Sequence, residues 1–339
     1  MAKAATIIPT HMNAMSWHGE HTPLPLMLVC VSVPKPKKAE VLIKVAYAGV
    51  NRAEVFQRNR HYPLPTSVPR IPGIEYSGTV ARLGAGTKGV KLGQRVCGII
   101  TEGGYAEYIT SPASMVLPVP ENLSLKEAAC LPEAMLTAWV SLMEQAALKK
   151  GETVLIHGGG SGVGVMAIQM ARVLGAQVIV TAGNDSKCTK CKKLGAHHTI
   201  NYNAKDFEVE IERITNGKGV DVILDMVGGD YTQKHLSILK TNGRLAIISF
   251  LRGAKTQVNL APVLLKKLAI FGSILRNRPL SEKSTFVKNM RKQLWKSVKT
   301  KKIIAVIDST FTLEDAKKAL DRMEENLNFG KILLQVGLE

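Results

Sequence analysis

The sequence has no uninterrupted apolar run near the roughly 20 residues that a membrane-spanning helix needs, so we expect no membrane protein. Residues 1–11 also lack the long apolar core of a secretory signal and the arginine-rich face of a transit peptide. Cysteine is scarce, with five in 339 residues. An odd and sparse cysteine content predicts free thiols in a reducing compartment and excludes a disulfide framework. We therefore expect a soluble protein of the cytoplasm.

Acidic residues are also in short supply, with 27 Asp and Glu against 45 Lys and Arg and a net charge of +18. Such a surplus attracts polyanions, whether RNA, an acidic membrane face or an anionic cofactor, and says little about the fold. The 29 Gly, 15 Pro and 45% apolar residues are typical of a globular chain. At about 100–200 residues per domain, the length predicts two domains.

The first third of the chain has the pattern of an irregular, barrel-like antiparallel sheet. Its predicted strands are separated by many Gly and Pro residues and lie at 41–47, 76–80, 95–100 and 105–110. From about residue 124 the sequence pattern changes from that of strands to that of helices, and residues 124–145 have helical periodicity.

The middle of the chain alternates short apolar strands with helices, which predicts βαβ units and a parallel sheet. The strands are predicted at 153–157, 177–181, 220–225 and 244–249. After residue 271 we expect a basic helix at 282–300, a strand at 303–307, a helix at 313–323 capped by Thr312, and a strand at 332–336. These segments predict an α/β domain inserted into a β-rich one.

A glycine-rich segment, HGGGSGVG at 157–164, follows a buried strand and opens a helix. That context is required for a dinucleotide fingerprint, in which glycines let the backbone approach a pyrophosphate at the helix N-terminus. Ser161 stands where the fingerprint has its second glycine. A glycine-rich turn without a ligand is the weaker alternative, because the segment follows the first strand of a βαβ series.

The second strand of that series ends at Gly183 with no acidic residue at its tip. NAD-type sites place Asp or Glu there to bind the ribose 2′-hydroxyl, and a carboxylate would repel the 2′-phosphate of NADP. Lys187 follows on the next turn and is predicted to pair with that phosphate. Asp185 opposes this interpretation, and a solvated lysine is the alternative for Lys187.

Residues 71–86 (IPGIEYSGTVARLGAG) and 92–96 (LGQRV) resemble the quinone oxidoreductase signature of the medium-chain dehydrogenase/reductase superfamily. Further motifs follow in the family's order at 49–54, 131–138, 157–164 and 330–332, so the resemblance runs from about residue 25 to the end. It implies an α/β fold with a GroES-like β-rich catalytic domain and an inserted Rossmann domain with a doubly wound parallel sheet. The catalytic domain would comprise 1–129 and 276–339, and the NADPH-binding Rossmann domain 130–275.

Several stretches are most similar to the p53-inducible NADPH quinone oxidoreductase branch, at 51–54, 57–58, 155–159, 201–207 and 275–278. The resemblance implies that Lys187 and Tyr202 contact the 2′-phosphate of NADPH and that Asn51 and 249–251 lie near the nicotinamide. The full set of implied cofactor residues is Asn51, Thr137, Gly159, Ser161, Gly162, Val163, Gly164, Gly183, Lys187, Tyr202, Ser249, Phe250, Leu251 and Lys331.

A metal site is not expected. Zinc-dependent relatives hold the ion with Cys, His and a carboxylate around an open position. Here 49–51 contains no cysteine, Ile74 stands where those relatives have histidine beside Glu75, and the four-cysteine lobe is missing. Cys188 and Cys191 lie within a predicted helix without a second pair, so we interpret them as incidental thiols.

The resemblance implies NADPH-dependent reduction of a quinone or enone by a homodimer joined at the edges of its Rossmann sheets. An acceptor reduced without a metal must already be electrophilic, and a reduced quinone takes its protons from water, so we name no catalytic acid. Asn51 and Tyr62 are predicted near the substrate. One alternative is reduction of activated double bonds in 2-alkenals, for which Tyr62 is the candidate proton donor.

A second alternative is an RNA-binding protein with a regulatory cofactor site. It draws on the charge of +18 and on 283–302, where eight Lys and Arg occur without an acid. A solvated helix with an apolar face is favoured over RNA binding, because nucleic-acid surfaces also need accessible stacking aromatics. The predicted apolar face consists of Val287, Met290, Leu294 and Val298.

Overall fold

The computed structural model describes residues 7–337, which divide into two compact units. Unit 1 comprises Met1–Glu133 and Ala305–Glu339, and unit 2 comprises Ala134–Ile304. Residues 1–6, part of the segment in which we expect no targeting signal, lie outside the described residues. Within 7–337, no helix is both long enough and apolar enough to cross a membrane.

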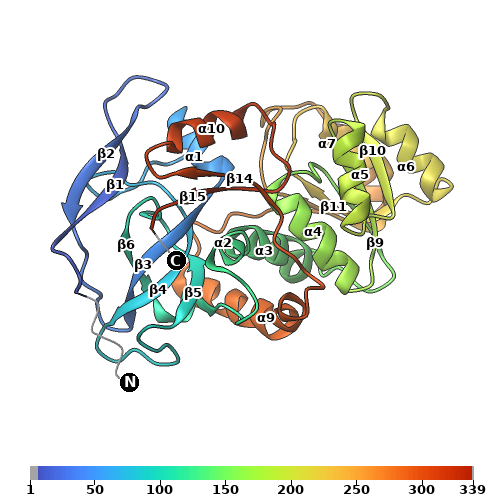
Figure 1. Ribbon diagram of the computed structural model, residues 1–339. Coiled ribbons are helices and arrows are strands. Elements are labelled where there is room, and N and C mark those ends of the chain that lie inside the picture. The colour runs from blue at the N-terminus through green and yellow to red at the C-terminus, as the bar shows by residue number, and fades with distance from the viewer. Residues whose placement is uncertain (1–6, 338–339) are drawn as a thin grey trace. The chain divides into compact units, whose positions relative to one another are not determined.

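Unit 1 is built on β-structure, and most of its neighbouring strands are antiparallel. Its larger sheet has the order β14-β15-β3-β4-β5-β7, with β6 also paired to β3, and β1 and β2 form a separate pair (Figure 1). The strands are β1 (His11–Trp17), β2 (Leu26–Ser32), β3 (Glu40–Val50), β4 (Glu75–Leu83), β5 (Arg95–Ile99), β6 (Tyr108–Pro112), β7 (Val116–Pro118), β14 (Ile307–Thr312) and β15 (Lys331–Gln335). The helical segments are α1 (Arg52–Arg58), η1 (Ala113–Met115), α2 (Leu125–Ala128) and α10 (Ala316–Glu324).

Unit 2 contains a six-stranded sheet in which every neighbouring pair is parallel, as predicted. Its order is β10-β9-β8-β11-β12-β13, the doubly wound order in which ligands bind at the carboxyl ends of the strands where the order reverses. The strands are β8 (Thr153–Ile156), β9 (Gln177–Ala182), β10 (His198–Asn201), β11 (Val220–Asp225), β12 (Leu239–Ile247) and β13 (Ala269–Gly272). The reversal lies between β8 and β11, so this is where a ligand is expected.

A helix follows each strand of unit 2 along the chain. These helices are α4 (Gly162–Val173), α5 (Asp185–Lys193), α6 (Phe207–Thr215), α7 (Tyr231–Ile238), α8 (Ala261–Leu265) and α9 (Leu280–Lys299). Before β8 the chain forms α3 (Pro132–Trp139), which begins at the border with unit 1, and the π-helical turn η2 (Val140–Gln145). The helix predicted at 124–145 is therefore interrupted, and Pro132 begins its second part, a position where its missing N–H costs no helical bond.

The strand predicted at 303–307 is wrong, because β14 begins only at Ile307. The Gln169 side chain donates to the carbonyl of Ile304 (3.1 Å) and accepts from its N–H (2.8 Å). These bonds use the backbone groups that a strand would need for pairing. Thr312 is the last residue of β14, and Asp315 occupies the N-cap position of α10 that we predicted for Thr312.

The basic helix α9 belongs to unit 2, whereas the predicted domain border at 275 assigns it to the catalytic domain. Its predicted apolar face is buried, together with Phe286, so one flank is packed and the other is charged and solvated. Asn289 on α9 also donates to Glu144 in η2 (3.1 Å). Packing against elements of unit 2 therefore moves the border to Ile304.

Candidate functional site

In the loop after β8, Gly158, Gly159 and Gly164 lie so close to neighbouring atoms that side chains would not fit on them. A Cβ atom on Gly159 would collide with the Val180 side chain on β9, and one on Gly164 with the backbone of Gly158 and Gly159. Gly158 has φ of +65°, a conformation that favours glycine. The loop therefore presents bare backbone at the carboxyl end of β8.

The N-terminus of α4 follows this loop directly. Ser161 is the N-cap, and its hydroxyl accepts a hydrogen bond from the N–H of Gly164 (2.9 Å). The N–H groups of Gly162 and Val163 have no acceptor inside the helix, as in the first turn of any helix. Together with the helix dipole they favour an anion. The serine in place of the fingerprint's second glycine thus acts as a helix cap.

Gly183 and Tyr202 lie against each other beyond the ends of the neighbouring strands β9 and β10. A Cβ atom on Gly183 would lie 2.9 Å from the Tyr202 hydroxyl. The Tyr202 N–H donates to the carbonyl of Ala182 (3.1 Å), and the Asn203 side chain donates to the carbonyl of Gly183 (2.7 Å). Tyr202 is 43% exposed, so its side chain is accessible to solvent. The structure brings these two predicted residues together.

Lys187 lies in the first turn of α5, just after Gly183. Its N–H donates to the Asn184 side chain, which caps the helix (2.8 Å). Asp185, the residue that opposes an NADP site, accepts a hydrogen bond from the Asn201 side chain on β10 (2.9 Å). An amide donor therefore partly compensates the negative charge of Asp185.

Residues 249–251 follow β12 and adjoin the turn after β11. The Leu251 N–H donates to the carbonyl of Met226 (3.1 Å), and a Cβ atom on Gly228 would lie 2.7 Å from the Phe250 ring. Phe250 and Leu251 are 48% and 44% exposed. These apolar side chains next to a glycine turn can pack against a flat ring, whereas Ser249 is only partly exposed.

A line of buried polar side chains adjoins both loops. His157 Nδ1 lies 2.9 Å from the Thr181 hydroxyl, and His157 Nε2 lies 2.9 Å from Nε2 of His235. His235 Nδ1 lies 3.7 Å from the Asp225 carboxylate. Burial lowers the pKa of His157 well below its usual range and that of His235 to about 3, and it raises the pKa of Asp225 to about 6. This group was not predicted from the sequence, although three of its members lie at the ends of apolar strands.

Unit 1 holds a second buried polar cluster, formed by Asn51, Glu75 and Lys331. The Lys331 ammonium pairs with Glu75 and donates to Asn51 Oδ1 (2.6 Å), and Asn51 Nδ2 donates to Glu75 Oε1 (3.1 Å). Burial lowers the pKa of Lys331, but the Glu75 and Glu133 carboxylates outweigh it, so the pKa is raised. The predicted residues Asn51 and Lys331 thus bind each other. Their shared bonds to Glu75 fix the orientation of the Asn51 amide and of the Lys331 ammonium group.

Glu54 extends this cluster. Its Oε2 accepts a hydrogen bond from the Asn51 N–H (2.8 Å), while Oε1 has no hydrogen-bond partner among residues 7–337. Burial raises the pKa of Glu54 to about 8, despite the opposing bond from its own N–H and the Lys331 charge. Of the remaining predicted residues, Tyr62 is partly buried after α1, and Thr137 on α3 accepts a bond from Ser141 through its carbonyl (2.8 Å). Their roles stay predictions.

No group of three His, Cys, Asp or Glu side chains in residues 7–337 is arranged to hold a metal ion. Cys188 and Cys191 are both buried on α5. Burial raises the pKa of Cys188, and that of Cys191 to about 12, so neither side chain is a ready thiolate ligand. The carboxylate of Glu75 is already paired with the Lys331 ammonium.

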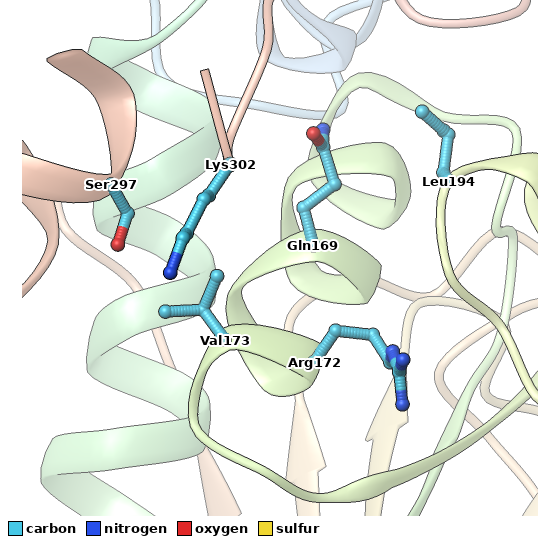
Figure 2. A pocket seen from close by; sticks show the side chains of 6 residues that line it. All are labelled: Gln169, Arg172, Val173, Leu194, Ser297 and Lys302. Carbon is cyan, nitrogen blue, oxygen red and sulfur yellow. The ribbon is translucent and has the colours of Figure 1, made fainter. Parts of the chain in front are cut away.

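A cavity of about 330 Å³ in unit 2 lies away from these groups. Figure 2 shows Lys302 and Ser297 facing Val173 of α4, with the Arg172 side chain extending in a different direction. Its other lining residues are Gln169 and Leu194. Because the α4 residues come from the end of the helix opposite to the glycine loop, this cavity is not the predicted cofactor site.

Comparisons with known proteins identify the family. The family described as alcohol dehydrogenase GroES-like domain matches residues 37–121, and that described as zinc-binding dehydrogenase matches 162–296. Quinone oxidoreductase from Rattus norvegicus is 31% identical over 306 residues, which cover 90% of this chain and 91% of the relative. The chain is a quinone oxidoreductase-like member of the medium-chain dehydrogenase/reductase superfamily. Its architecture is a GroES-like domain with a Rossmann-type domain, as the sequence predicts.

Solved structures of related oxidoreductases share the fold. Escherichia coli quinone oxidoreductase complexed with NADPH is 27% identical with a TM-score of 0.85, covering 96% of this chain and all (100%) of that one. The CurK enoyl reductase is 26% identical with a TM-score of 0.84, covering 97% and 100%. This quinone oxidoreductase-like protein is therefore an NAD(P)-dependent oxidoreductase in its general class.

The residues of this quinone oxidoreductase-like protein fit a nicotinamide dinucleotide. Gly159 and Gly164 let the loop pack closely against β9 and the start of α4, where a side chain would collide. The capped start of α4 follows this loop, and its free N–H groups match the charge of a pyrophosphate.

Proposed function

We propose that the protein reduces quinones with NADPH, without a metal ion. The observation that carries the proposal is the pairing of the glycine loop at 158–164 with Gly183, Lys187 and Tyr202 beyond the end of β9, where the nearby Asp185 carboxylate accepts a hydrogen bond from Asn201. When bound, the reduced nicotinamide supplies the electrons for the reaction. The chain would hold the pyrophosphate with the loop at 161–164, through the free N–H groups of Gly162 and Val163, and the 2′-phosphate with Lys187 and Tyr202.

The residues predicted near the nicotinamide would act by orientation. Phe250 and Leu251 offer exposed apolar surface beside the turn at Gly228, which suits one face of a ring. Asn51, whose amide is fixed by Lys331 and Glu75, and Tyr62 are proposed on the side of the acceptor. A quinone accepts charge on its own oxygens, so this proposal requires no side chain to give up a proton.

Coenzyme preference tests the first part of the proposal. We expect NADPH to bind at least about tenfold more tightly than NADH, because a charge-assisted hydrogen bond to the phosphate contributes about 1.5–3 kcal/mol. Lys187→Ala should remove most of this preference and leave NADH affinity unchanged. Lys193→Ala, at the exposed end of the same helix, is the matched control and should change neither affinity. Equal affinities for the two coenzymes in the wild type would overturn the assignment of Lys187 and Tyr202.

The similarity to an enoyl reductase favours a second candidate, reduction of the activated double bond of a 2-alkenal. That reaction needs a proton donor opposite the hydride, for which Tyr62 is the candidate. Turnover of an ortho-quinone and of a 2-alkenal with NADPH, compared for the wild type and Tyr62→Phe, separates the two. Fast quinone reduction that survives Tyr62→Phe supports the main proposal, whereas alkenal reduction lost in the variant supports the alternative.

We also propose that two chains associate through the edge strand β13. Large apolar side chains around it are exposed: Leu260 (62%), Leu264 (80%), Leu265 (77%), Ile270 (42%) and Ile274 (47%). Clusters of this kind mark association surfaces, and an uncovered edge strand offers unpaired backbone groups. Sedimentation should give twice the mass of one chain for the wild type and a single-chain mass for Leu265→Asp with Ile270→Lys. A monomeric wild type would contradict the proposal.

A further inference from the structure

Four buried side chains form a continuous polar line from β9 to the turn after β11. Thr181 on β9 contacts His157 at the end of β8, His157 contacts His235 on α7, and His235 faces Asp225 at the end of β11. All four are at most 1% exposed. Bulk water does not reach them, so we assign each proton among these groups.

The direction of the line is set at its Asp225 end. The Asp225 carboxylate accepts from the N–H groups of Val227 (2.7 Å) and Gly228 (3.2 Å), so it is an acceptor. His235 Nδ1 has no hydrogen-bond partner in residues 7–337, and the Asp225 carboxylate lies 3.7 Å away. A lone pair on that nitrogen would face a negative charge, whereas an N–H would be attracted to it. The proton of His235 therefore belongs on Nδ1.

The remaining protons follow from this placement. With Nδ1 protonated, His235 Nε2 is an acceptor, so His157 must donate from its own Nε2 across the 2.9 Å contact. His157 Nδ1 is then an acceptor and receives the Thr181 hydroxyl proton. Both imidazoles are neutral in this arrangement, in agreement with the lowered pKa of each. The two histidines carry opposite tautomers.

Aromatic rings enclose the two imidazoles and keep them neutral. Phe207 and Tyr231 lie edge-on to His157, with ring centroids 4.9 Å and 5.3 Å away. The cations nearest to these rings, Lys234 and Arg252, lie over their faces at 5.5 Å and 5.2 Å. Protonation of either histidine would place a positive charge in a region that excludes water and is bordered by these two cations. Both effects disfavour the charged imidazole.

Each end of the line is bonded to a loop at the predicted coenzyme site. His157 directly precedes Gly158, and the Thr181 carbonyl accepts from the N–H of Gly159 (2.9 Å). At the other end, the Asp225 carboxylate bonds the turn at Val227 and Gly228. β8 and β11 are the two strands between which the sheet order reverses. The line therefore connects the phosphate loop with the turn beside Phe250.

We propose that Thr181, His157 and His235 form a directional hydrogen-bond chain, that the facing Asp225 carboxylate sets its proton order by electrostatic attraction, and that these four residues hold the glycine loop and the Val227–Gly228 turn at the separation the coenzyme requires. His157 and His235 are positioning residues, since neither side chain is exposed. The identity of the bound molecule rests on the proposed function, whereas the proton order is a property of the chain alone.

Nitrogen-15 spectra of histidine in the coenzyme-free protein test the proton order. Near neutral pH we expect His157 protonated on Nε2 only and His235 on Nδ1 only. His157 protonated on Nδ1, or either ring doubly protonated, would overturn the proposal. This measurement needs no bound coenzyme, so it remains valid if NADPH binding itself fails and the proposed function falls.

Variants test the positioning role through coenzyme affinity. His235→Phe keeps the ring but removes both nitrogens, and we expect NADPH to bind at least about tenfold more weakly. His235→Gln, which can still accept from His157 and donate towards Asp225, should restore most of the affinity. Wild-type affinity in His235→Phe would contradict the proposal.

A matched control separates positioning from loss of stability. Leu236→Ala removes a fully buried side chain of the same helix and should lower the stability of the protein without changing NADPH affinity. If His235→Phe does not fold, Thr181→Val removes the donor at the head of the chain with little change in volume. It should weaken NADPH binding while His157 stays protonated on Nε2, because the contact with His235 still sets that proton, and wild-type affinity in this variant would overturn the proposal.

Discussion

At the scale of single residues, Lys331 and Glu75 form a buried ion pair. Both side chains are at most 3% exposed, and Asn51 bonds to each of them. A buried pair of this kind adds little stability over an apolar pair of the same shape, but loss of one partner leaves an uncompensated charge.

Lys331→Met should therefore lower the free energy of unfolding by about 3–5 kcal/mol, measured by urea denaturation. The double variant with Glu75→Gln should recover most of that loss, because the remaining amide can still accept from the Glu133 N–H. Lys302→Met, at an exposed lysine, is the control and should stay within about 0.5 kcal/mol of the wild type. An equal loss in the single and double variants would contradict the account.

Glu54 gives a prediction about pH. Its pKa of about 8 in the folded protein exceeds the ordinary 4.5, so the folded state keeps a proton that the unfolded state releases. The contribution of Glu54 to stability is thus greatest below about pH 4.5 and is lost as pH rises to about 8. Glu54→Gln, which keeps the neutral shape, should gain stability relative to the wild type over that range, by up to about 5 kcal/mol at pH 8. Unfolding curves at pH 5 and pH 8 check this, and a constant difference would exclude it.

At the scale of elements, α4 depends on a single cap. The Ser161 hydroxyl bonds to the N–H of Gly164, and the helix begins with two glycines in three residues, which favour helix poorly. Ser161→Ala should lower the free energy of unfolding by about 1 kcal/mol. Ser161→Thr keeps the capping oxygen and should lie near the wild type. Chemical denaturation of the wild type and the two variants measures their free energies of unfolding. An alanine variant as stable as the wild type would contradict the role of the cap.

At the scale of the whole molecule, the five cysteines differ in exposure. Cys30 on β2 is exposed, while Cys97, Cys130, Cys188 and Cys191 are buried. Burial also raises the pKa of each buried thiol. A thiol reagent such as dithionitrobenzoate should therefore label one cysteine quickly in the native protein and all five after denaturation. Cys30→Ser should abolish the fast phase, and a second fast thiol would contradict the burial of the others.

The parallel sheet and the glycine loop were predicted correctly, because the sequence patterns that indicate them are local. Apolar strands that run into glycines and then a helix can be recognised within a dozen residues. The sequence was misleading at 303–307, where an apolar β-branched run has a strand pattern but Gln169 binds the backbone of Ile304. It also did not predict β13 (Ala269–Gly272), which has four residues and is mostly exposed, so its pattern is weak.

The sequence by itself determined the family, the glycine-rich loop before a helix and the absence of an acid at the end of β9, because each depends on residues close together in the chain. Only the tertiary structure decided that Lys331 meets Glu75, that Asn201 binds Asp185, and that His157 meets His235. Those contacts join segments far apart in the sequence, and the polar side chains pair because burial removes the water that would otherwise satisfy them.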